Sequence, residues 1–276
     1  MKKSIVLFCC FLPLIYFSQN VRFTYNYKFI SDTLSKDVFS EEVVVLDFYS
    51  RENQSVFTGL KHIISDSAMA EEARRGIMSF PDASSKVRFV IEKTDNQNSR
   101  YFYTPDHMAE PVLKVRDDRK INWEILNENM NILGYKAQKA TTFFAGREWT
   151  AWFTPEIPIS DGPYKFYGLP GLILKILDKT NTHSFEIISI QKQKSNYFIL
   201  NDNAYKFAKQ TTFDVYKKIV EDERKNPLAK LRNDALNGVF FFHTNEEKQQ
   251  FLKNIDTQIK EIKIHDNNPI EILNGK

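Results

Sequence analysis

Apolar and polar side chains alternate from Val21 to Ile30. A period of two places successive side chains on opposite faces, so this segment is predicted to form a half-buried β-strand. Other short segments rich in β-branched and aromatic residues also read as strands, and proline, glycine or charged turns separate them. These predicted strands cover residues 43–48, 87–91, 100–103, 112–115, 121–125, 139–144, 148–153, 172–177 and 185–190.

Three turns organise these strands. Ala145-Gly146-Arg147 predicts a hairpin in which Gly146 adopts a positive φ. The segment Leu172–Leu177 contains one polar residue, Lys175, and is therefore predicted to be a central strand covered on both faces. The charged run 116–120 is interpreted as a solvated hairpin tip.

The last third of the chain changes to the helical period. Capping-box spacing in Thr211–Asp214 and Thr244–Glu247, and the Asn226-Pro227 pair, each precede an apolar stripe, while residues 67–75 predict a shorter helix. Amphipathic helices need an apolar surface to cover. The expected fold class is therefore α+β, a curved antiparallel sheet, open or half barrel-like, covered by the C-terminal helices.

The N-terminus has the form of a signal peptide. Met1–Lys3 is basic, residues 5–17 are apolar, and Ser18 begins a polar stretch. The apolar run is shorter than the ~20 residues that cross a bilayer. We expect residues 1–18 to be removed and residues 19–276 to form a single β-rich domain without a transmembrane span. Export to the periplasm or the outer membrane is expected, in preference to release outside the cell.

Charge and cysteine content narrow the functional classes. Cys9 and Cys10 both lie in the apolar run, so the mature chain would have no thiol for disulfides, cysteine catalysis or thiolate metal sites. The net charge of +3 falls to +1 when Lys2 and Lys3 are removed. Nucleic acid is therefore not an expected partner.

The segment that opens the predicted central strand predicts a specific turn. Pro170 presets φ for the second position of a type II turn, and Gly171 can take the positive φ of the third position. The full hexapeptide is Gly168, Leu169, Pro170, Gly171, Leu172 and Ile173.

This hexapeptide resembles the motif that names the GLPGLI family, exported proteins found mostly in Bacteroidota. Residues 134–140, 151–158, Gly162-Pro163 and 268–271 are also similar to that family, so the resemblance covers essentially the whole mature chain. Ala137 stands where relatives often carry cysteine, so a thiol role in those relatives does not transfer. The resemblance implies export, an antiparallel sheet-rich fold and residence in the envelope, and it implies no catalytic residue.

Candidate chemistry is sparse. No two histidines have the spacing that places two ligands on one metal, and no nucleophile elbow, zinc-protease, P-loop or dinucleotide motif occurs. We therefore expect no metal, no cofactor and no catalytic residue. A serine paired in space with Asp161 or with Asp106-His107 is left open. The five histidines are His62, His107, His183, His243 and His265.

One ligand site is predicted from the strand pattern. Trp152 faces away from Trp149 and Phe153 on its strand, and Glu156 follows at the strand's end. We predict that Trp152, Glu156 and Tyr167 lie at the mouth of a ligand groove. The alternative is that Trp152 fills a second core layer and Glu156 accepts backbone hydrogen bonds in the turn.

Two functions remain open. The first is an exported envelope protein without catalysis, which binds an apolar small molecule or an outer-membrane partner. The second is an exported hydrolase whose site is assembled from distant residues.

Overall fold

The computed structural model describes residues 20–77, 79, 82, 84–94, 99–104, 112–193, 199–201, 203–265 and 267–273. The predicted signal peptide lies outside these residues. The strands are β1 (Val21–Phe29), β2 (Ser40–Tyr49), β3 (Gln54–Gly59), β4 (Val90–Thr94), β5 (Ser99–Tyr103), β6 (Leu113–Arg116), β7 (Glu124–Ile132), β8 (Tyr135–Phe144), β9 (Arg147–Thr154), β10 (Leu172–Asp178), β11 (His183–Lys192) and β12 (Lys209–Thr212). The helices are α1 (Leu60–Arg74), the 3-10 helix η2 (Ile199–Asn201), α2 (Asn203–Lys206), α3 (Phe213–Lys225), α4 (Ala229–Leu236) and α5 (Asn245–His265).

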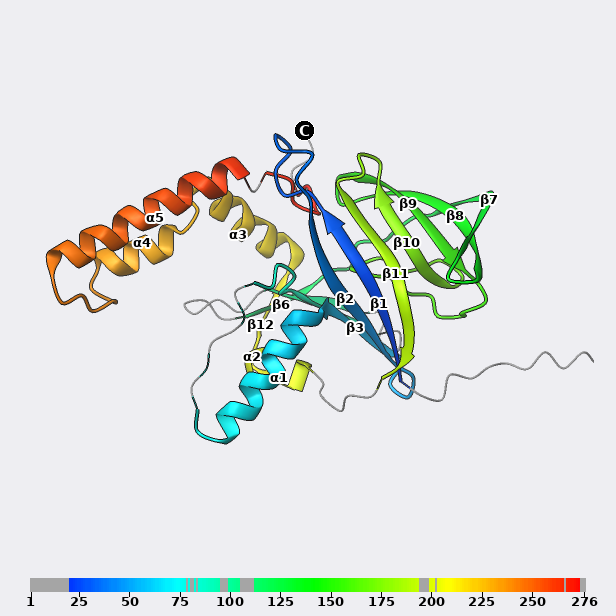
Figure 1. Ribbon diagram of the computed structural model, residues 1–276, viewed down its shortest axis with the longest axis horizontal. Coiled ribbons are helices and arrows are strands. Elements are labelled where there is room, and N and C mark those ends of the chain that lie inside the picture. Colours follow the sequence, from blue (N-terminus) through cyan, green and yellow to red (C-terminus); the bar gives the residue numbers. More distant parts are fainter. Residues whose placement is uncertain are drawn as a thin grey trace, which may run out of the picture.

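In the described part of the chain, all 12 strands belong to one sheet in the order β12-β6-β5-β4-β3-β2-β1-β11-β10-β9-β8-β7 (Figure 1). Its end strands, β12 and β7, do not pair with each other, so the sheet is open. Every neighbouring pair is antiparallel except β12 and β6, which run parallel. The sheet is therefore mixed, whereas the sequence predicted a purely antiparallel one.

The strand patterns that the sequence shows decide which sheet face is buried. In β1, Val21, Phe23, Tyr25 and Tyr27 are each at most 5% exposed, as the alternation predicted. The central position of β10, between β9 and β11, is also confirmed. The core lies between this sheet face and residues 155–171. That loop contributes its own buried apolar side chains, namely Ile157, Ile159, Tyr164, Phe166 and Leu169.

The Gly171 turn closes this loop, and its conformation differs from the predicted type. Gly171 has φ +147°, in the region that favours glycine, as expected. Its backbone N–H donates to the carbonyl of Leu169 over 2.8 Å, which closes a three-residue turn rather than a type II turn. A Cβ at Gly171 would overlap the backbone of Thr154 and Pro155. The loop therefore lies directly against the end of β9.

The C-terminal strap, residues 267–273, ties the chain end back to the sheet. Asn268 donates from Nδ2 to the carbonyl of Ile30 over 2.6 Å and accepts at Oδ1 from Arg147 over 2.6 Å. The Ile272 N–H donates to the carbonyl of Ala145 over 2.9 Å. Gly146 has the predicted positive φ, and a Cβ there would collide with Ile272. The β8–β9 hairpin turn is thus shaped to receive the strap.

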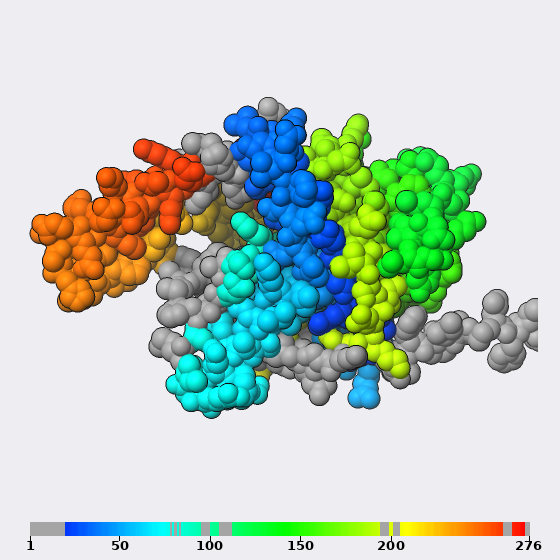
Figure 2. Space-filling model, in the orientation of Figure 1, coloured from blue at the N-terminus to red at the C-terminus, as the bar shows by residue number. Residues whose placement is uncertain are grey.

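The helical third forms as predicted but does not cover the sheet. The Val215 N–H donates to the Thr212 hydroxyl at the start of α3, one residue after the predicted cap, and the Glu247 N–H donates to the Thr244 hydroxyl before α5. Of these three helices, α3 packs on β6 and β12, and α4 and α5 pack mainly on each other. In Figures 1 and 2 the α4–α5 pair extends away from the sheet. The expectation of a covering layer is not confirmed: α3 packs Phe213 and Tyr216 against the core, whereas α4 and α5 lie against each other.

Candidate functional site

A row of four side chains, three of them polar, crosses the sheet on its core face. Register pairs Phe48 with Ser55, Ser55 with Lys93, and Lys93 with Arg100. Directly opposed residues on neighbouring strands share a face. Four strands therefore present one continuous row in which two cations are immediate neighbours.

The loop between β9 and β10 covers this row. Asp161 and Tyr167 form an isolated antiparallel bridge that holds the loop's two ends together. The Lys93 ammonium is ion-paired with Asp161 and donates to the carbonyls of Gly162 and Tyr164 over 2.6 and 3.1 Å. The Lys93 side chain thus links the β9–β10 loop to the sheet.

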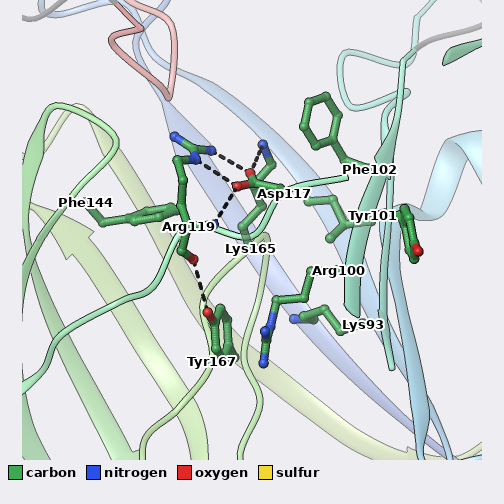
Figure 3. A pocket seen from close by; sticks show the side chains of 10 residues that line it. Lys93, Arg100, Tyr101, Phe102, Asp117, Arg119, Phe144, Lys165 and Tyr167 are labelled. Atoms are coloured by element: carbon green, nitrogen blue, oxygen red, sulfur yellow. Dashed lines mark hydrogen bonds and ion pairs between the residues drawn. The ribbon is translucent and has the colours of Figure 1, made fainter. Parts of the chain in front are cut away.

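Between the sheet and the β9–β10 loop lies a cavity of about 280 Å³, which we call the Arg100 cleft. A narrow slot of about 10 Å³, room for roughly one water, adjoins it (Figure 3). Lys93, Arg100 and Tyr167 line both spaces. The Arg100 cleft is lined by Phe48, Asn53, Ser55, Lys93, Arg100, Pro158, Ile159, Ser160, Asp161 and Tyr167.

Arg100 and Tyr167 stack on each other where the two spaces meet. The guanidinium carbon lies 3.3 Å from the centre of the tyrosine ring, which is cation–π geometry. The Tyr167 hydroxyl donates to the carbonyl of Arg119 over 3.1 Å (Figure 3), and the Trp123 indole donates to the carbonyl of Tyr167 over 2.8 Å. Partial burial raises the pKa of Tyr167, so its hydroxyl is neutral near pH 7. Both the hydroxyl and the backbone carbonyl of Tyr167 are therefore hydrogen-bonded, which fixes the position of the ring against the Arg100 guanidinium.

Behind the slot lies a network of charged side chains from distant segments. Arg119 binds Asp117 through two contacts of 2.8 and 2.6 Å and reaches Glu271 over 2.8 Å. Lys165 lies 3.0 Å from Asp117 and 2.6 Å from Glu271, and its ammonium is 3.6 Å from the centre of the Phe102 ring. The network links the segment after β6, the loop before β10 and the C-terminal strap.

The charges of this network shift its carboxyl groups toward the ionised form. Burial raises the pKa of Asp117, but Arg119 and Lys165 outweigh it and hold that pKa at about 2. Burial likewise opposes ionisation of Glu271, and Lys165 and Arg119 lower its pKa nevertheless. Both carboxylates are therefore charged at neutral pH. The charged run 116–120 is solvated only in part: Arg116, Asp118 and Lys120 are exposed, but Asp117 is only 6% exposed. It is not a hairpin tip, because β6 and β7 on either side of it do not pair with each other.

Among the described residues that line the cleft and the slot or belong to this network, four are cations and three are carboxylates. The carboxylates are Asp117, Asp161 and Glu271, and the cations are Lys93, Arg100, Arg119 and Lys165. The wider cleft also presents hydroxyl and amide groups from Asn53, Ser55 and Ser160. Such a lining suits a small polar molecule that carries negative charge.

The three residues predicted at a groove mouth do not share one cavity. Tyr167 lines the Arg100 cleft. Trp152 does face away from Trp149, is half-buried, and lines a separate open depression of about 730 Å³ together with Lys139 and Phe143. Glu156 is exposed and accepts from the backbone N–H of Lys136 in β8 over 2.9 Å, so its backbone partner lies outside its own turn.

Most residues of the site were not predicted, although for some of them part of the signal is present in the sequence. Lys93 continues the alternation that buries Ile91, and Arg100 precedes Phe102 by two positions on its strand. Both therefore fall on the core face. Nothing local to the sequence indicates that Lys165 and Asp117 meet.

Asp161 does pair with a serine, as the sequence analysis left open. Ser55 donates its hydroxyl hydrogen bond to Asp161, and both side chains are buried. The third member of the cluster is Lys93 rather than a histidine. A serine triad needs a base that accepts the serine proton and passes it on. The Lys93 ammonium donates to Asp161 and to backbone carbonyls, so it does not fill that role.

The described histidines lie away from the cleft. His62 contacts the hydroxyls of Thr58 and Tyr205 over 3.0 Å each, and His183 contacts the hydroxyl of Tyr27 over 2.7 Å. His243 is exposed beside Glu247. His107 and the side chain of His265 lie outside the described residues. Within the described residues, no group of three or more His, Cys, Asp or Glu side chains is arranged to hold a metal ion.

Comparison with protein families gives one match. Residues 144–175 match a family model described as "Protein of unknown function (Porph_ging)". This stretch contains β9 and residues 168–173, on which the resemblance to the GLPGLI family rests. The GLPGLI assignment itself stays a prediction. Among curated proteins, no sequence gives a significant match.

Solved structures show a related fold. Two crystal structures of PNGF-II, in space groups P21 and C2, align with TM-scores of 0.52 and 0.51 at 17% sequence identity. Each alignment covers 75% of this chain but only 34% and 33% of the PNGF-II chains. At this identity the likeness concerns the fold alone. In the described part of the chain, no helix combines the length and apolar character needed to span a membrane.

Proposed function

We propose that this chain is an exported protein of the cell envelope that binds a small anionic ligand in the Arg100 cleft and does not transform it. The proposal of export rests on the basic start and the apolar run of residues 5–17. The proposal of binding rests on the lining of the cleft.

The pairing of Lys93 with Arg100 carries the proposal. Like charges directly opposite each other on neighbouring strands destabilise a sheet. Here the pair faces a cavity, on the same face as the core. Asp161 offsets the charge of Lys93, and the Tyr167 ring supports the guanidinium of Arg100. An anion in the cleft would lie beside both cations and accept hydrogen bonds from the Arg100 guanidinium and the Ser160 hydroxyl.

Binding is favoured over catalysis because proton-transfer groups are missing from this lining. Ser55 donates to Asp161, the Lys93 ammonium is held by Asp161 and carbonyls, and the Tyr167 hydroxyl donates to a carbonyl. General acid–base chemistry needs a group that takes and returns a proton at the reacting atom. The exported hydrolase is therefore the weaker alternative.

The charged lining also favours an anion over the apolar molecule that the sequence suggested. Covering the Arg100 guanidinium with an apolar ligand would remove water from a cation without replacing the hydrogen bonds of that water. An outer-membrane partner is compatible with a ligand-binding role.

The test is a thermal melt of the protein with phosphate, sulfate, acetate and citrate, each compared with a neutral sugar at equal ionic strength. A ligand that binds only the folded state raises the melting temperature, because it adds RT ln(1 + L/Kd) to the free energy of unfolding, where L is the free ligand concentration. We expect at least one anion to raise it and the sugar to leave it unchanged. Arg100→Gln should abolish that rise, and Ser160→Ala should reduce it.

Arg75→Gln is the matched control, since Arg75 is exposed beyond the end of α1 and pairs with Glu71. It should keep the full anion response. If no anion stabilises the protein, or if Arg100→Gln responds like the wild type, the cleft is not an anion site. Native mass spectrometry of protein taken from its own envelope would then identify any retained ligand directly.

A further inference from the structure

Helices α4 and α5 form an arm that projects from the molecule. They run against each other, and the loop that joins them, residues 237–244, lies at the end farthest from the sheet (Figure 1). The arm has a small core of its own in which Ala235, Leu252 and Ile255 are each at most 8% exposed. The space-filling view shows the arm standing clear of the body on that side (Figure 2).

The tip of this arm is apolar and solvent-exposed. Residues 239–242 read Val-Phe-Phe-Phe without a charge. Phe240 and Phe242 turn inward, with their ring centres 5.6 and 5.4 Å from that of Phe251. Val239 and Phe241 turn outward and are 67% and 84% exposed. The inner pair thus braces the outer pair in position.

We propose that this tip inserts into a lipid bilayer. Exposed apolar patches on soluble domains mark surfaces that are covered in use. A projecting tip can insert into a deformable apolar surface. A bilayer is such a surface, because it accommodates single side chains without a preformed groove.

The size of the tip favours lipid over a protein partner. Its outward side chains, Val239, Phe241 and the 48% exposed Leu236, offer on the order of 300 Å² of apolar surface. A stable protein interface, including one between two copies of this chain, buries about 800 Å² on each side. The tip alone falls short of that area, whereas each inserted side chain contributes to membrane binding by itself.

The charge of the arm indicates how the contact should respond to salt. Between residues 229 and 265, which span the arm, six Lys or Arg residues are nearly balanced by five Asp or Glu residues. Electrostatic attraction to anionic headgroups is therefore weak. Insertion should be as strong on phosphatidylcholine as on phosphatidylglycerol, and nearly independent of salt concentration.

The experiment is flotation of the protein with phosphatidylcholine vesicles and with vesicles of phosphatidylethanolamine and phosphatidylglycerol. The wild type should float with both. The double variant Val239→Ser/Phe241→Ser should lose partitioning by about tenfold or more, because two apolar side chains no longer leave water. Phe207→Ser is the matched control, since Phe207 is 81% exposed but lies after α2, outside the arm. It should float like the wild type.

A second measurement, tryptophan fluorescence, reports on the tip directly. Membrane binding by an apolar N-terminal segment would not change its result. Phe241→Trp should show a blue shift of its added tryptophan emission with vesicles and quenching by brominated lipid, whereas Phe207→Trp should show neither. Flotation of the double variant at the wild-type level, or no quenching of the tryptophan at position 241, overturns the proposal. Self-association that Phe241→Ser abolishes, in the absence of vesicle binding, would assign the tip to a second copy instead.

Discussion

The Arg100 cleft and the α4–α5 arm are built in opposite ways. The charge network behind the cleft joins Asp117, Lys165 and Glu271, which come from three segments far apart in the chain. The arm is held by neighbours in sequence, such as Phe240 with Phe251 and Arg232 with Asp256. Contacts between distant segments form only when the whole body folds, whereas local contacts break and reform alone.

This difference predicts which part of the molecule a substitution will destabilise. A change in the body should lower the stability of the entire sheet, because the C-terminal strap and the loop before β10 share their anchors. A change in the arm should leave the body folded. Matched pairs of residues, one from each region, make the comparison measurable.

The largest effect is expected from glycine substitution. Gly171→Val places a β-branched residue at φ +147° and drives its Cβ into the backbone of Thr154. The cost should be about 3 kcal/mol or more of unfolding free energy, measured by urea denaturation. Gly238→Val is the counterpart in the arm, at φ +79° with nothing within 4 Å of a Cβ, and should cost about 1–2 kcal/mol, confined to the arm. Equal losses would mean that the Gly171 turn is not sterically required.

Breaking the buried charge network should come next. Glu271→Gln keeps the size of the side chain but leaves Lys165 and Arg119 with one carboxylate fewer. Removing one partner from a buried ion pair typically costs about 3–5 kcal/mol, but the Gln amide can still accept hydrogen bonds, so the loss should be about 3 kcal/mol or less. Glu148→Gln, in an exposed pair with Lys179, is the control within the same sheet. A chemical denaturation midpoint for Glu271→Gln that matches this control would show that the network contributes little to stability.

A pH dependence should separate a buried histidine from an exposed one. Burial, followed by the charge of Arg147, lowers the pKa of His183 from 6.5 to about 4. The unfolded chain therefore binds a proton at a higher pH than the folded chain does. Stability is full above pH 6.5 and falls as the pH drops from about 6.5 to about 4, by about 3 kcal/mol in total.

Thermal melts between pH 7 and 5 check this expectation. His183→Gln, which does not titrate, should flatten the profile, although it should also lower stability at pH 7. His243→Gln in the arm, where the imidazole is 80% exposed, should leave the profile unchanged. A profile that keeps its slope without His183 would assign the acid sensitivity to other groups.

The smallest effect is expected in the arm itself. Asp256→Asn removes an ion pair with Arg232 in which both side chains are more than 40% exposed. Exposed ion pairs contribute about 0–1 kcal/mol. Hydrogen exchange should show somewhat faster exchange in α4 and α5 and no change in β1 or β10. Altered exchange in those central strands would mean that arm and sheet unfold together.

Local patterns in the sequence were sufficient for several elements of this protein. The alternation in β1, the positive φ of Gly146 and the cap at Thr244 were predicted correctly. Each depends on residues within a few positions of one another, and the period of side chains or the steric limits of φ act at that range. The outward face of Trp152 follows from the same rule.

The tertiary structure alone decided the site. Lys93 and Arg100 become neighbours through strand register, and Asp117 is buried because Lys165 and Glu271 reach it from the loop and the strap. A charged run looks solvated in sequence, since a lone buried charge is costly; only partners brought by other segments remove that cost. The tertiary structure also decided how the helices pack. Their apolar stripes show that one face is buried, but not which other element buries it.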